Sequence, residues 1–431
     1  MKPGAALSYE ATPAFSVPLR FFLTAPLFGM LAGLLLMMEP AALASRWTPA
    51  ALSLTHLITV GFMLMVMTGA LFQVLPVVAG AAIPGARYVS AVVHLTLTLG
   101  ACLLSLGLLL MSPGMLLAAA IVSTLALGIF LIASILGLWA TPIGPQATPR
   151  DLRLALVGLM VTLALGIALI LILSRGQPWP LLELLRLHIG WAWLGGVGLL
   201  LAGTSWLVVP MFQITPNYPG ILTRVWSPIA FVLLFVWSVC TLMGLSIPAT
   251  VITALLMLLS ALFPVTTLWV QAHSRRAKPD SIFRIIQFSM VNILVGLVVV
   301  AGIELTLLEG THWPLVAGIL IMHGGFVSFI SGMLYKIVPF LAWLNLTQAG
   351  VRAPNVKKLL PEIAIKRQLL AHALLSLTLL VAAISGDPLL IRLSGMGLVV
   401  AFALLLSNLF KVFRQYGVQQ KMHSGYKEIA E

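Results

Sequence analysis

The sequence predicts an all-α integral membrane protein with twelve transmembrane helices, and three observations support this prediction. First, hydrophobic residues make up 61% of the 431 residues and charged residues only 8%, whereas a soluble domain contains roughly 25% charged residues. Second, the chain contains twelve apolar stretches, each with about the 20 residues that a helix needs to cross a bilayer. Third, no segment is left over for a soluble domain. The whole chain, 1–431, is therefore expected to form a single transmembrane domain.

The predicted helices follow from the positions of the apolar stretches. They span residues 18–38, 51–76, 87–112, 115–140, 152–174, 184–210, 222–245, 247–271, 283–307, 313–342, 364–385 and 388–411. Very short turns near Pro113-Gly114, Ser246-Ile247 and Gly386-Asp387 join three pairs of neighbouring helices. The N-terminus lacks a small-residue cleavage site, so no removable signal peptide is expected.

Lysine and arginine residues predict the orientation of the helices, because loops rich in these residues stay on the cytoplasmic side. If the N-terminus is cytoplasmic, 20 of the 24 lysine and arginine residues lie at the inner face, Lys2 and Arg352 among them. The four outer residues are Arg46, Arg175, Arg186 and Arg392. We therefore expect both termini in the cytoplasm. Because the net charge of +13 is spread over short loops and tails, no nucleic-acid partner is expected.

A sequence repeat occurs on the stretches 51–76, 184–210 and 313–342, which are four helices apart. Its pattern is G-x-x-aromatic-x-x-x-P, preceded by one histidine 9 to 15 residues before the glycine. The three copies are His56, Gly69, Phe72 and Pro76; His188, Gly203, Trp206 and Pro210; and His323, Gly332, Tyr335 and Pro339. Such recurrence predicts three pseudo-symmetric four-helix repeats over approximately residues 18–140, 152–271 and 283–411.

Each part of the repeat has a physical interpretation. The glycine allows a neighbouring helix or a flat ring to approach closely, the aromatic residue is expected to anchor the cytoplasmic end, and the proline is expected to end the helix. Each histidine lies 16 to 22 residues before its proline, which at about 1.5 Å per residue places it in the outer half of the bilayer. Polar residues in membrane spans are usually functional, although a packing repeat with incidental histidines is the alternative.

The helix count and the repeat resemble subunit I of the heme–copper oxidase superfamily. The nitric oxide reductase and cbb-type branches fit best, because there the helix with a heme-ligating histidine also ends in a G-x-x-Y-x-x-x-P-like run. The runs HLITVGFMLMVMTGALFQVLPVVAG and PLRFFLTAPLFGMLAGLLL are also similar to NnrS-type heme- and copper-containing membrane proteins. The resemblance implies a heme–copper oxidase subunit I-like fold in a bacterial inner (cytoplasmic) membrane.

The resemblance also implies which residues bind heme. His56 matches an axial ligand of the low-spin heme, and His323 stands where the family has an H-x-H pair, of which one histidine is missing. His188 loosely matches a copper ligand, but the stretch 222–245 contains no histidine, so the usual copper triad cannot be assembled. This departure argues against conventional terminal oxidase activity and leaves open whether the chain is an oxidoreductase-like enzyme.

Heme b is the predicted cofactor, bound noncovalently because the sequence has no CxxCH motif. Two imidazoles are a common axial pair, and we expect His56 with His323 or His188 as the heme iron ligands, the choice of pair being open. Glycines near two of these histidines leave room for a ring or pack helices together. They are Gly190, Gly195, Gly196, Gly198, Gly324 and Gly325. Copper is a weaker alternative, suggested by the thioethers of Met63, Met65 and Met67.

Three further residues are secondary site candidates. His94 and His372 lie early in the stretches 87–112 and 364–385, which begin at the predicted cytoplasmic face. They are therefore expected in the opposite half of the bilayer from the other three histidines, in contact with each other, at a second polar site, or as packing residues. Glu304, near the outer end of 283–307, could transfer protons, balance heme charge or bind a cation.

These features predict a stand-alone membrane b-type heme protein. It would transfer electrons from a periplasmic or membrane electron donor, or bind a diatomic gas such as nitric oxide. The rival hypothesis is a transporter, or a metal-handling or oxidase-assembly protein, without redox turnover. A threefold repeat counts against a secondary transporter, since inverted twofold repeats are common there. The sequence leaves the oligomeric state open, and the lipid bilayer is the one partner that composition itself indicates.

Overall fold

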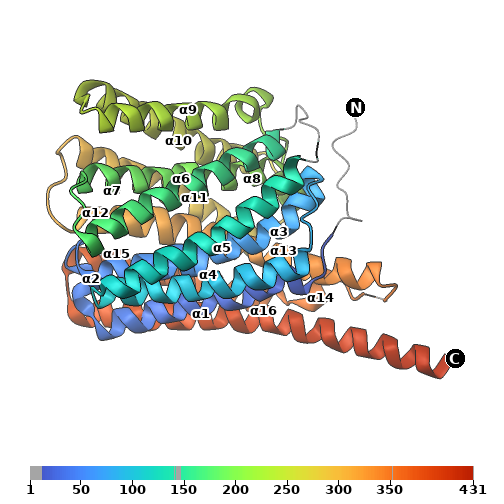
Figure 1. Cartoon of the computed structure of the whole chain (residues 1–431). Helices are drawn as coiled ribbons and strands as arrows, with labels where there is room; N and C mark the ends of the chain where they lie inside the picture. The colour runs from blue at the N-terminus through green and yellow to red at the C-terminus, as the bar shows by residue number, and fades with distance from the viewer. Residues whose placement is uncertain (1–11, 140, 142–146, 352, 431) are drawn as a thin grey trace. The chain divides into compact units, whose positions relative to one another are not determined.

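A computed structural model describes residues 12–139, 141, 147–351 and 353–430 of the chain (Figure 1). Lys2 and Arg352, which the charge distribution assigns to the inner face, lie outside the described residues, as does the predicted helix end at 140. Among the described residues, twelve helical spans are long and apolar enough to cross a membrane. The prediction of an all-α, twelve-span membrane protein is confirmed at this level. Its arrangement as three heme–copper oxidase-like repeats within one domain stays a prediction.

Most spans are single helices, and three consist of consecutive segments. The single helices are α1 (Ser16–Met38), α4 (Ala86–Leu109), α5 (Pro113–Trp139), α6 (Ala147–Arg175), α9 (Gly220–Leu242), α10 (Ser246–Ala272), α11 (Ser281–Glu304), α15 (Glu362–Ser385) and α16 (Pro388–Ala430). The composite spans are α2 (Pro49–His56) with η3 (Leu57–Leu64) and α3 (Met65–Ala79), α7 (Leu181–Gly190) with η4 (Trp191–Gly198) and α8 (Leu199–Gln213), and α12 (Trp313–Gly318) with η5 (Ile319–Val327) and α13 (Ser328–Gln348). Two short helices, η2 (Pro40–Leu43) and α14 (Val356–Leu359), lie in connections.

The predicted ends agree with the structure to within three residues except at three helices, and the first is α6, which begins at Ala147 rather than 152. The tenth span continues to Gln348 rather than 342, and α16 continues to Ala430 rather than 411. Hydropathy marks where the sequence stops being apolar, whereas a polar sequence without proline, as in both of these C-terminal extensions, can continue the same helix beyond that point. The three tight turns are confirmed. Gly244 and Gly386 adopt φ angles of 69° and 65° in two of them, a left-handed conformation that costs glycine little.

The described contacts divide the chain into two compact units, which we describe separately. Unit 1 comprises 1–12, 74–277 and 293–305, and unit 2 comprises 13–73, 278–292 and 306–431. Within unit 1, α4 packs against α5, α6 packs against α7, η4 and α8, and α9 packs against α10. Within unit 2, α1 and α16 run side by side (Figure 1), α15 packs against α16, and η3 contacts both α1 and η5.

Glycines set the spacing between α1 and α16. A Cβ atom on Gly33 would lie 2.6 Å from the carbonyl oxygen of Gly395, and one on Gly395 would lie 2.7 Å from the carbonyl oxygen of Gly33. The two backbones are therefore in direct contact at this point. Small residues at such crossings are a general means of associating helices where lipid removes the hydrophobic driving force. Phe402 closes the same contact by packing over Gly29.

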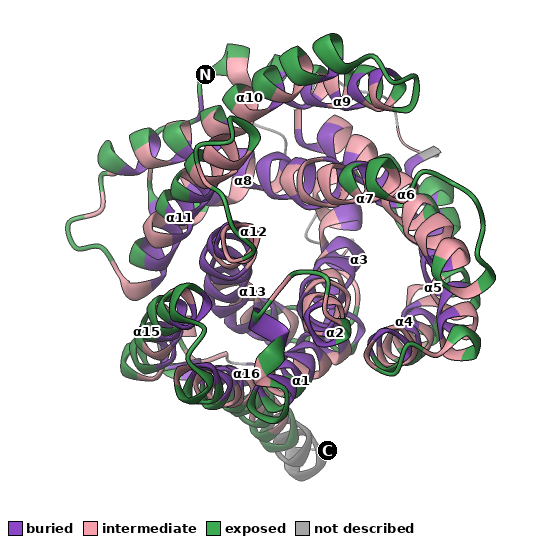
Figure 2. Ribbon diagram, turned by 90° about the vertical axis from the view of Figure 1, so that its left-hand side faces the viewer, coloured by how far each residue is buried: buried purple, intermediate pink, exposed green. Residues whose placement is uncertain are grey.

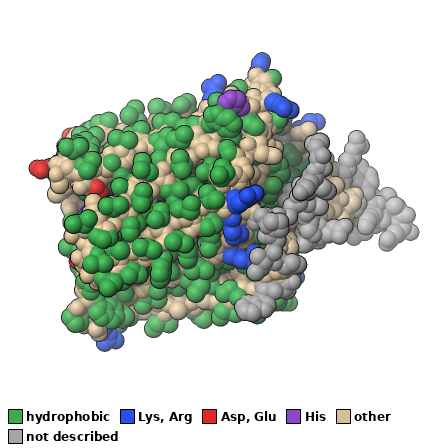
Figure 3. All heavy atoms as spheres, turned by 90° about the horizontal axis from the view of Figure 1, so that it is seen from above, with side chains coloured by type: hydrophobic (Ala, Val, Ile, Leu, Met, Phe, Trp, Pro, Cys, Tyr) green, Lys and Arg blue, Asp and Glu red, His purple; other side chains and the backbone are tan. Residues whose placement is uncertain are grey.

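The exposed face of α9 and α10 is apolar in the way a lipid-facing surface requires. Figure 3 shows hydrophobic side chains over most of this face, with Lys and Arg side chains towards one end. Exposed apolar residues recur every three or four positions, among them Val225, Ile229, Val232, Phe235 and Val239 on α9 and Val251, Leu255, Leu258 and Leu262 on α10. This pattern supports contact with a lipid bilayer, because water would not solvate so large a continuous apolar surface.

The three spans with the histidine repeat are the most buried of the twelve. Within their most apolar windows, 67% of Pro49–Ala79, 61% of Leu181–Gln213 and 83% of Trp313–Gln348 is buried, against at most 50% for any other span. Figure 2 shows α13 and α3 mostly in the colours of buried and intermediate residues, whereas α9 has a large share in the colour of exposed residues. The histidines of the repeat therefore lie on the helices with the least exposure to lipid.

A single methyl group should separate the packing role of Gly395 from its helix propensity. Gly395→Ala is expected to destabilise the protein by about 1–3 kcal/mol, because backbone atoms of α1 must move away. The matched control is Gly417→Ala on the same helix, where a Cβ would meet no atom within 4 Å. That variant should be unchanged or up to about 1 kcal/mol more stable. Thermal unfolding in detergent measures both, and equal effects would contradict the α1–α16 contact.

Candidate functional site

Each span of the histidine repeat contains a π-helical segment at or next to its histidine. His56 directly precedes η3, His188 lies three residues before η4, and His323 is the fifth residue of η5. π-helical turns are rare and occur frequently at functional sites. No feature of the sequence alone indicated these segments. Their recurrence at equivalent places is a structural property that the three copies share, in addition to the sequence pattern.

His56 belongs to unit 2 and is partly buried. Its Nδ1 lies 2.8 Å from the carbonyl oxygen of Leu52, one turn earlier. Since a carbonyl oxygen can only accept a hydrogen bond, Nδ1 must be the protonated nitrogen of the neutral ring. Nε2 then has the lone pair. Metal-ligating histidines commonly use their other ring N–H in this way, which fixes the tautomer and the ring orientation.

His188 belongs to unit 1 and contacts α6. Its Nδ1 donates a hydrogen bond to the carbonyl oxygen of Thr162 at 3.1 Å, and a Cβ on Gly166 would lie 3.2 Å from its Cε1 atom. Nε2 is again the unprotonated nitrogen of the neutral ring. The structure therefore gives His188 the same tautomer as His56, within the other unit.

His323 lies in unit 2 and is buried, with 6% of its surface exposed. Its Nδ1 is 3.0 Å from the hydroxyl of Ser376 on α15. Its Nε2 is fully buried and has no hydrogen-bond partner among the described residues. A buried polar atom without a partner is costly and rare in folded proteins. Other buried atoms of the described residues, mostly hydroxyl and amide oxygens, also lack a partner, and His323 Nε2 is the imidazole nitrogen among them. As a common type of metal ligand, this nitrogen is a candidate for a bond to a group supplied from outside the chain.

The expectation that His372 lies in the opposite half of the bilayer from His323 is wrong. The two rings stack with centroids 4.3 Å apart and an interplanar angle of 25°. The helix starts explain the error: His323 is ten residues from Trp313, and His372 is ten residues from Glu362. About 15 Å into spans that run in opposite directions, both reach the middle of a hydrocarbon layer about 30 Å thick.

The repeat glycines make the close helix contacts that the sequence predicted. A Cβ on Gly69 would lie 2.7 Å from Phe21 on α1, one on Gly203 would lie 2.8 Å from Asp151 on α6, and one on Gly332 would lie 2.8 Å from Ile285 on α11. In each copy the partner is the span that precedes the histidine helix. The glycine of the repeat thus has the same packing role three times.

The aromatic residues of the repeat are not interfacial anchors, and this prediction is wrong. Phe72 and Tyr335 are no more than 2% exposed and Trp206 is 9% exposed. Their partners lie within the protein. Phe72 packs on Phe21 with centroids 5.6 Å apart, Trp206 Nε1 donates to the buried carboxylate of Asp151 at 2.8 Å, and Asn408 donates to the Tyr335 hydroxyl at 3.1 Å.

The prolines of the repeat do not end their helices, which is a second correction. Pro76, Pro210 and Pro339 lie inside α3, α8 and α13, and the chain stays helical for at least three more residues in each case. Membrane helices tolerate proline because neighbouring groups and local adjustments satisfy the freed backbone carbonyl. The repeat therefore marks a position within the span and not its boundary.

Atoms of the protein occupy the space beside the glycines near the histidines. A Cβ on Gly190 would meet Trp237 at 2.6 Å, and one on Gly195 would meet Trp191 at 2.5 Å. Gly196 faces Leu159, Gly198 faces the carbonyl of Trp193, and Gly324 is covered by Asn292 of α11. The carbonyl oxygen of Gly325 accepts a hydrogen bond from Ser289 at 2.8 Å. Of the two interpretations open from the sequence, helix packing is the one these contacts support.

The remaining candidates lie in unit 1 with other partners. Glu304 forms an ion pair with Arg186 at 2.5 Å, and both side chains are more than 40% exposed. Exposed pairs of this kind contribute little to stability. His94 lies on α4, where its carbonyl oxygen accepts a hydrogen bond from Thr98 at 2.7 Å. Neither residue is brought together with another site candidate of its own unit by the described contacts.

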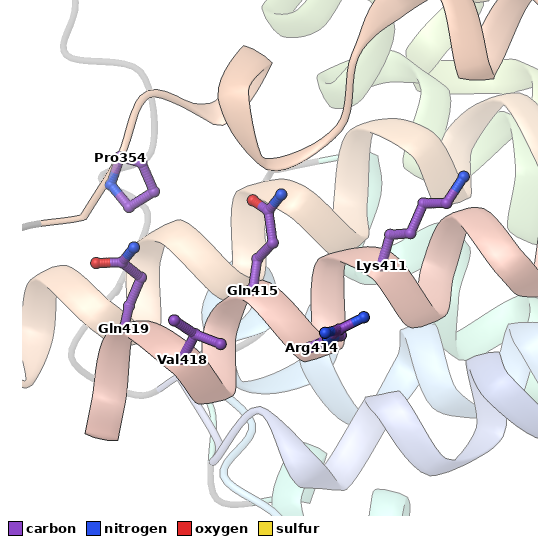
Figure 4. Close-up of a pocket in the computed structure, with 6 residues that line it drawn as sticks. All are labelled: Pro354, Lys411, Arg414, Gln415, Val418 and Gln419. Atoms are coloured by element: carbon purple, nitrogen blue, oxygen red, sulfur yellow. The ribbon is translucent and has the colours of Figure 1, made fainter. Parts of the chain in front are cut away.

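Two further observations concern where a metal ion or a ligand could bind. Among the described residues, no group of three or more His, Cys, Asp or Glu side chains could bind a metal ion. A surface hollow in unit 2 is lined by side chains of α16 and the loop before α14: Pro354, Lys411, Arg414, Gln415, Val418 and Gln419 (Figure 4). The hollow contains none of the predicted site residues, so the histidines remain the candidates.

Comparison with known proteins adds no assignment. No family model matches the chain, and no curated protein matches it. The fold class therefore rests on the helices themselves, and the role of the histidines rests on their geometry and on the sequence motifs.

The donor chemistry of unit 2 fits a heme iron better than a bare metal ion. His56 and His323 both belong to unit 2, and the segments η3 and η5 are in contact. Each offers one imidazole nitrogen, and a heme iron needs only two protein ligands because its macrocycle supplies four nitrogens. Sequence reasoning missed Ser376, the partner of His323. Its position four residues after His372, and so on the same helix face, was the available signal.

A double substitution should test the contact that closes the η5 segment. Gly324→Ala is expected to destabilise the protein, because the Cβ would lie 2.7 Å from Cγ of Asn292. Asn292→Ala removes that obstacle, so the pair should be less destabilised than the sum of the two single variants, by at least about 0.5 kcal/mol.

Thermal unfolding of the four proteins in detergent provides the measurement. Gly318→Ala on α12 is the control, since the nearest atom to its Cβ would be Met322 Cε at an ordinary 3.5 Å. Additive effects of the two substitutions would show that Asn292 does not occupy this space in solution.

Proposed function

We propose that the chain is a stand-alone membrane b-type heme protein whose heme iron is ligated by His56 and His323. The observation that supports this most is the buried Nε2 of His323, which has no hydrogen-bond partner among the described residues. A lone pair in that environment gains a bond if iron binds and remains unsatisfied if nothing does. His56 contributes the second imidazole, with its tautomer fixed by Leu52.

The choice between His323 and His188 follows from the units. His56 and His323 belong to the same compact unit and lie on spans whose π-helical segments are in contact, whereas His188 belongs to the other unit. We therefore assign the pair to His56 and His323 and give His188 no role in this heme.

The proposed activity is electron transfer. A bound heme would supply one-electron chemistry, and the chain would supply binding, orientation and electrostatics. His56 and His323 would together hold the heme, and a heme held by two histidines would favour electron transfer over binding of a diatomic gas such as nitric oxide. His323 itself is buried, with Ser376, Ser328 and His372 as its polar neighbours.

Heme content should depend on two of the three repeat histidines. Purified wild type is expected to show a reduced-minus-oxidised spectrum of b-type heme, and pyridine hemochrome should quantify one low-spin heme. His56→Ala and His323→Ala should lose most of it, because each removes an iron ligand. His188→Ala, and His273→Ala in the loop after α10, should retain it.

The outcomes discriminate between the hypotheses. A colourless wild-type protein, after expression with ample heme supply, would contradict the proposal and favour the transporter or metal-handling hypothesis. Loss of heme in His188→Ala with retention in His323→Ala would move the second ligand to unit 1. A spectrum that carbon monoxide or nitric oxide shifts would replace electron transfer with gas binding.

A further inference from the structure

Two histidines and two serines of unit 2 form one closed hydrogen-bond network. Ser376 on α15 lies 3.0 Å from Nδ1 of His323 and donates to the carbonyl oxygen of His372 at 3.0 Å. Ser328 on α13 lies 2.9 Å from Nε2 of His372 and donates to the carbonyl oxygen of His323 at 3.1 Å. Each serine thus links one histidine ring to the backbone of the other histidine.

A serine has a single hydroxyl proton, and this determines the direction of every bond in the network. Because Ser376 uses its proton on the carbonyl of His372, its oxygen must accept from Nδ1–H of His323. If Nδ1 were instead the acceptor, two oxygens would face each other without a proton, and a buried Nε2–H of His323 would have no acceptor. The same reasoning makes Nε2 of His372 a donor to Ser328.

We infer that Ser376 and Ser328 fix the stacked histidines in opposite tautomers, with the proton of His323 on Nδ1 and that of His372 on Nε2. This inference extends the proposed function, on which its account of iron ligation rests. Nε2 of His323 becomes the ligating nitrogen, Ser376 becomes a positioning residue, and His372 is excluded as a ligand through Nε2. Its ring instead supports that of His323 by stacking at 4.3 Å.

The π-helical segment is what makes the network possible. Ser328 follows His323 by five residues, and its hydroxyl reaches the carbonyl of His323 across the wider turn of η5. In an α-helix a serine reaches the carbonyl three or four residues back, as Ser376 does with His372. The η5 segment therefore lets one serine contact both the His323 backbone and the His372 ring.

The tautomers can be measured without heme. Full-length protein labelled with ¹⁵N in histidine, prepared heme-free and reconstituted in lipid vesicles, gives separate solid-state NMR signals for protonated and unprotonated ring nitrogens. His323→Gln and His372→Gln assign the signals. The expected result is a protonated Nδ1 for His323 and a protonated Nε2 for His372. A protonated Nε2 on His323 would overturn the inference.

Substitutions of the serines test the cause of the tautomers. Ser376→Ala should give a mixture of His323 tautomers, whereas Ser376→Thr, which retains the hydroxyl, should preserve the wild-type signals. Ser328→Ala should change the signals of His372 and leave those of His323 as they are. If Ser376→Ala leaves the His323 signals unchanged, Ser376 does not fix the tautomer.

In heme-loaded protein, the midpoint potential provides a readout that a purely structural role would not change. Ser376→Ala should weaken heme retention by about 10-fold and shift the potential to more positive values, because the ligand loses electron density that favours ferric iron. Ser376→Thr should restore both. If wild type never binds heme but shows the expected tautomers, the proposed function fails and the tautomer assignment stands. If heme binds and Ser376→Ala leaves the potential unchanged, the proposed function stands and the positioning role of Ser376 fails.

Discussion

A polar group inside an apolar membrane span must find a partner within the protein, and this requirement organises the described structure. Inside hydrocarbon an unsatisfied group costs several kcal/mol, and many intramembrane polar side chains of the described residues find a partner on their own helix or a neighbouring one. Thr55, Thr59, Thr96 and Thr98 donate back to carbonyls of their own helices. Asp151 accepts from both Arg150 and Trp206. Other buried groups, Thr68, Ser105 and Ser134 among them, lack a hydrogen-bond partner among the described residues, as does Nε2 of His323. Nε2 of His323 differs from these hydroxyls because it is an imidazole nitrogen, a common metal ligand.

The sequence predicted the spans well because hydropathy reports the bilayer directly. It predicted the close approach of Gly69, Gly203 and Gly332 for an equally direct reason, since a missing side chain leaves space whatever surrounds it. It failed where the outcome depends on a partner. Phe72, Trp206 and Tyr335 are chemically suited to an interface, but their positions are decided by the helices beside them. The prediction that the prolines end their helices was wrong for the same reason, because neighbouring helices can satisfy the freed carbonyl.

The candidate site was predictable in part. Three histidines on equivalent helices were visible as a pattern, yet their tautomers were not, because a tautomer depends on which carbonyl or hydroxyl lies within about 3 Å. The contact between His323 and His372 joins residues 49 positions apart on antiparallel spans. Sequence gives the depth of each residue only to within several ångströms, and that uncertainty was enough to place the two rings on opposite sides of the membrane centre.

The π-helical segments have a consequence for how such spans can change during evolution. In an α-helix each residue advances the direction of the side chain by about 100°, so loss of one residue would rotate everything before it relative to everything after. A wide turn can absorb such a loss by reverting to α-helical geometry. Residues on either side of η3, η4 and η5 can therefore tolerate insertions and deletions of single residues at these places. The π-helical segments overlap the interval between histidine and glycine, which is 13, 15 and 9 residues long in the three copies, whereas the glycine-to-proline spacing is seven residues in each.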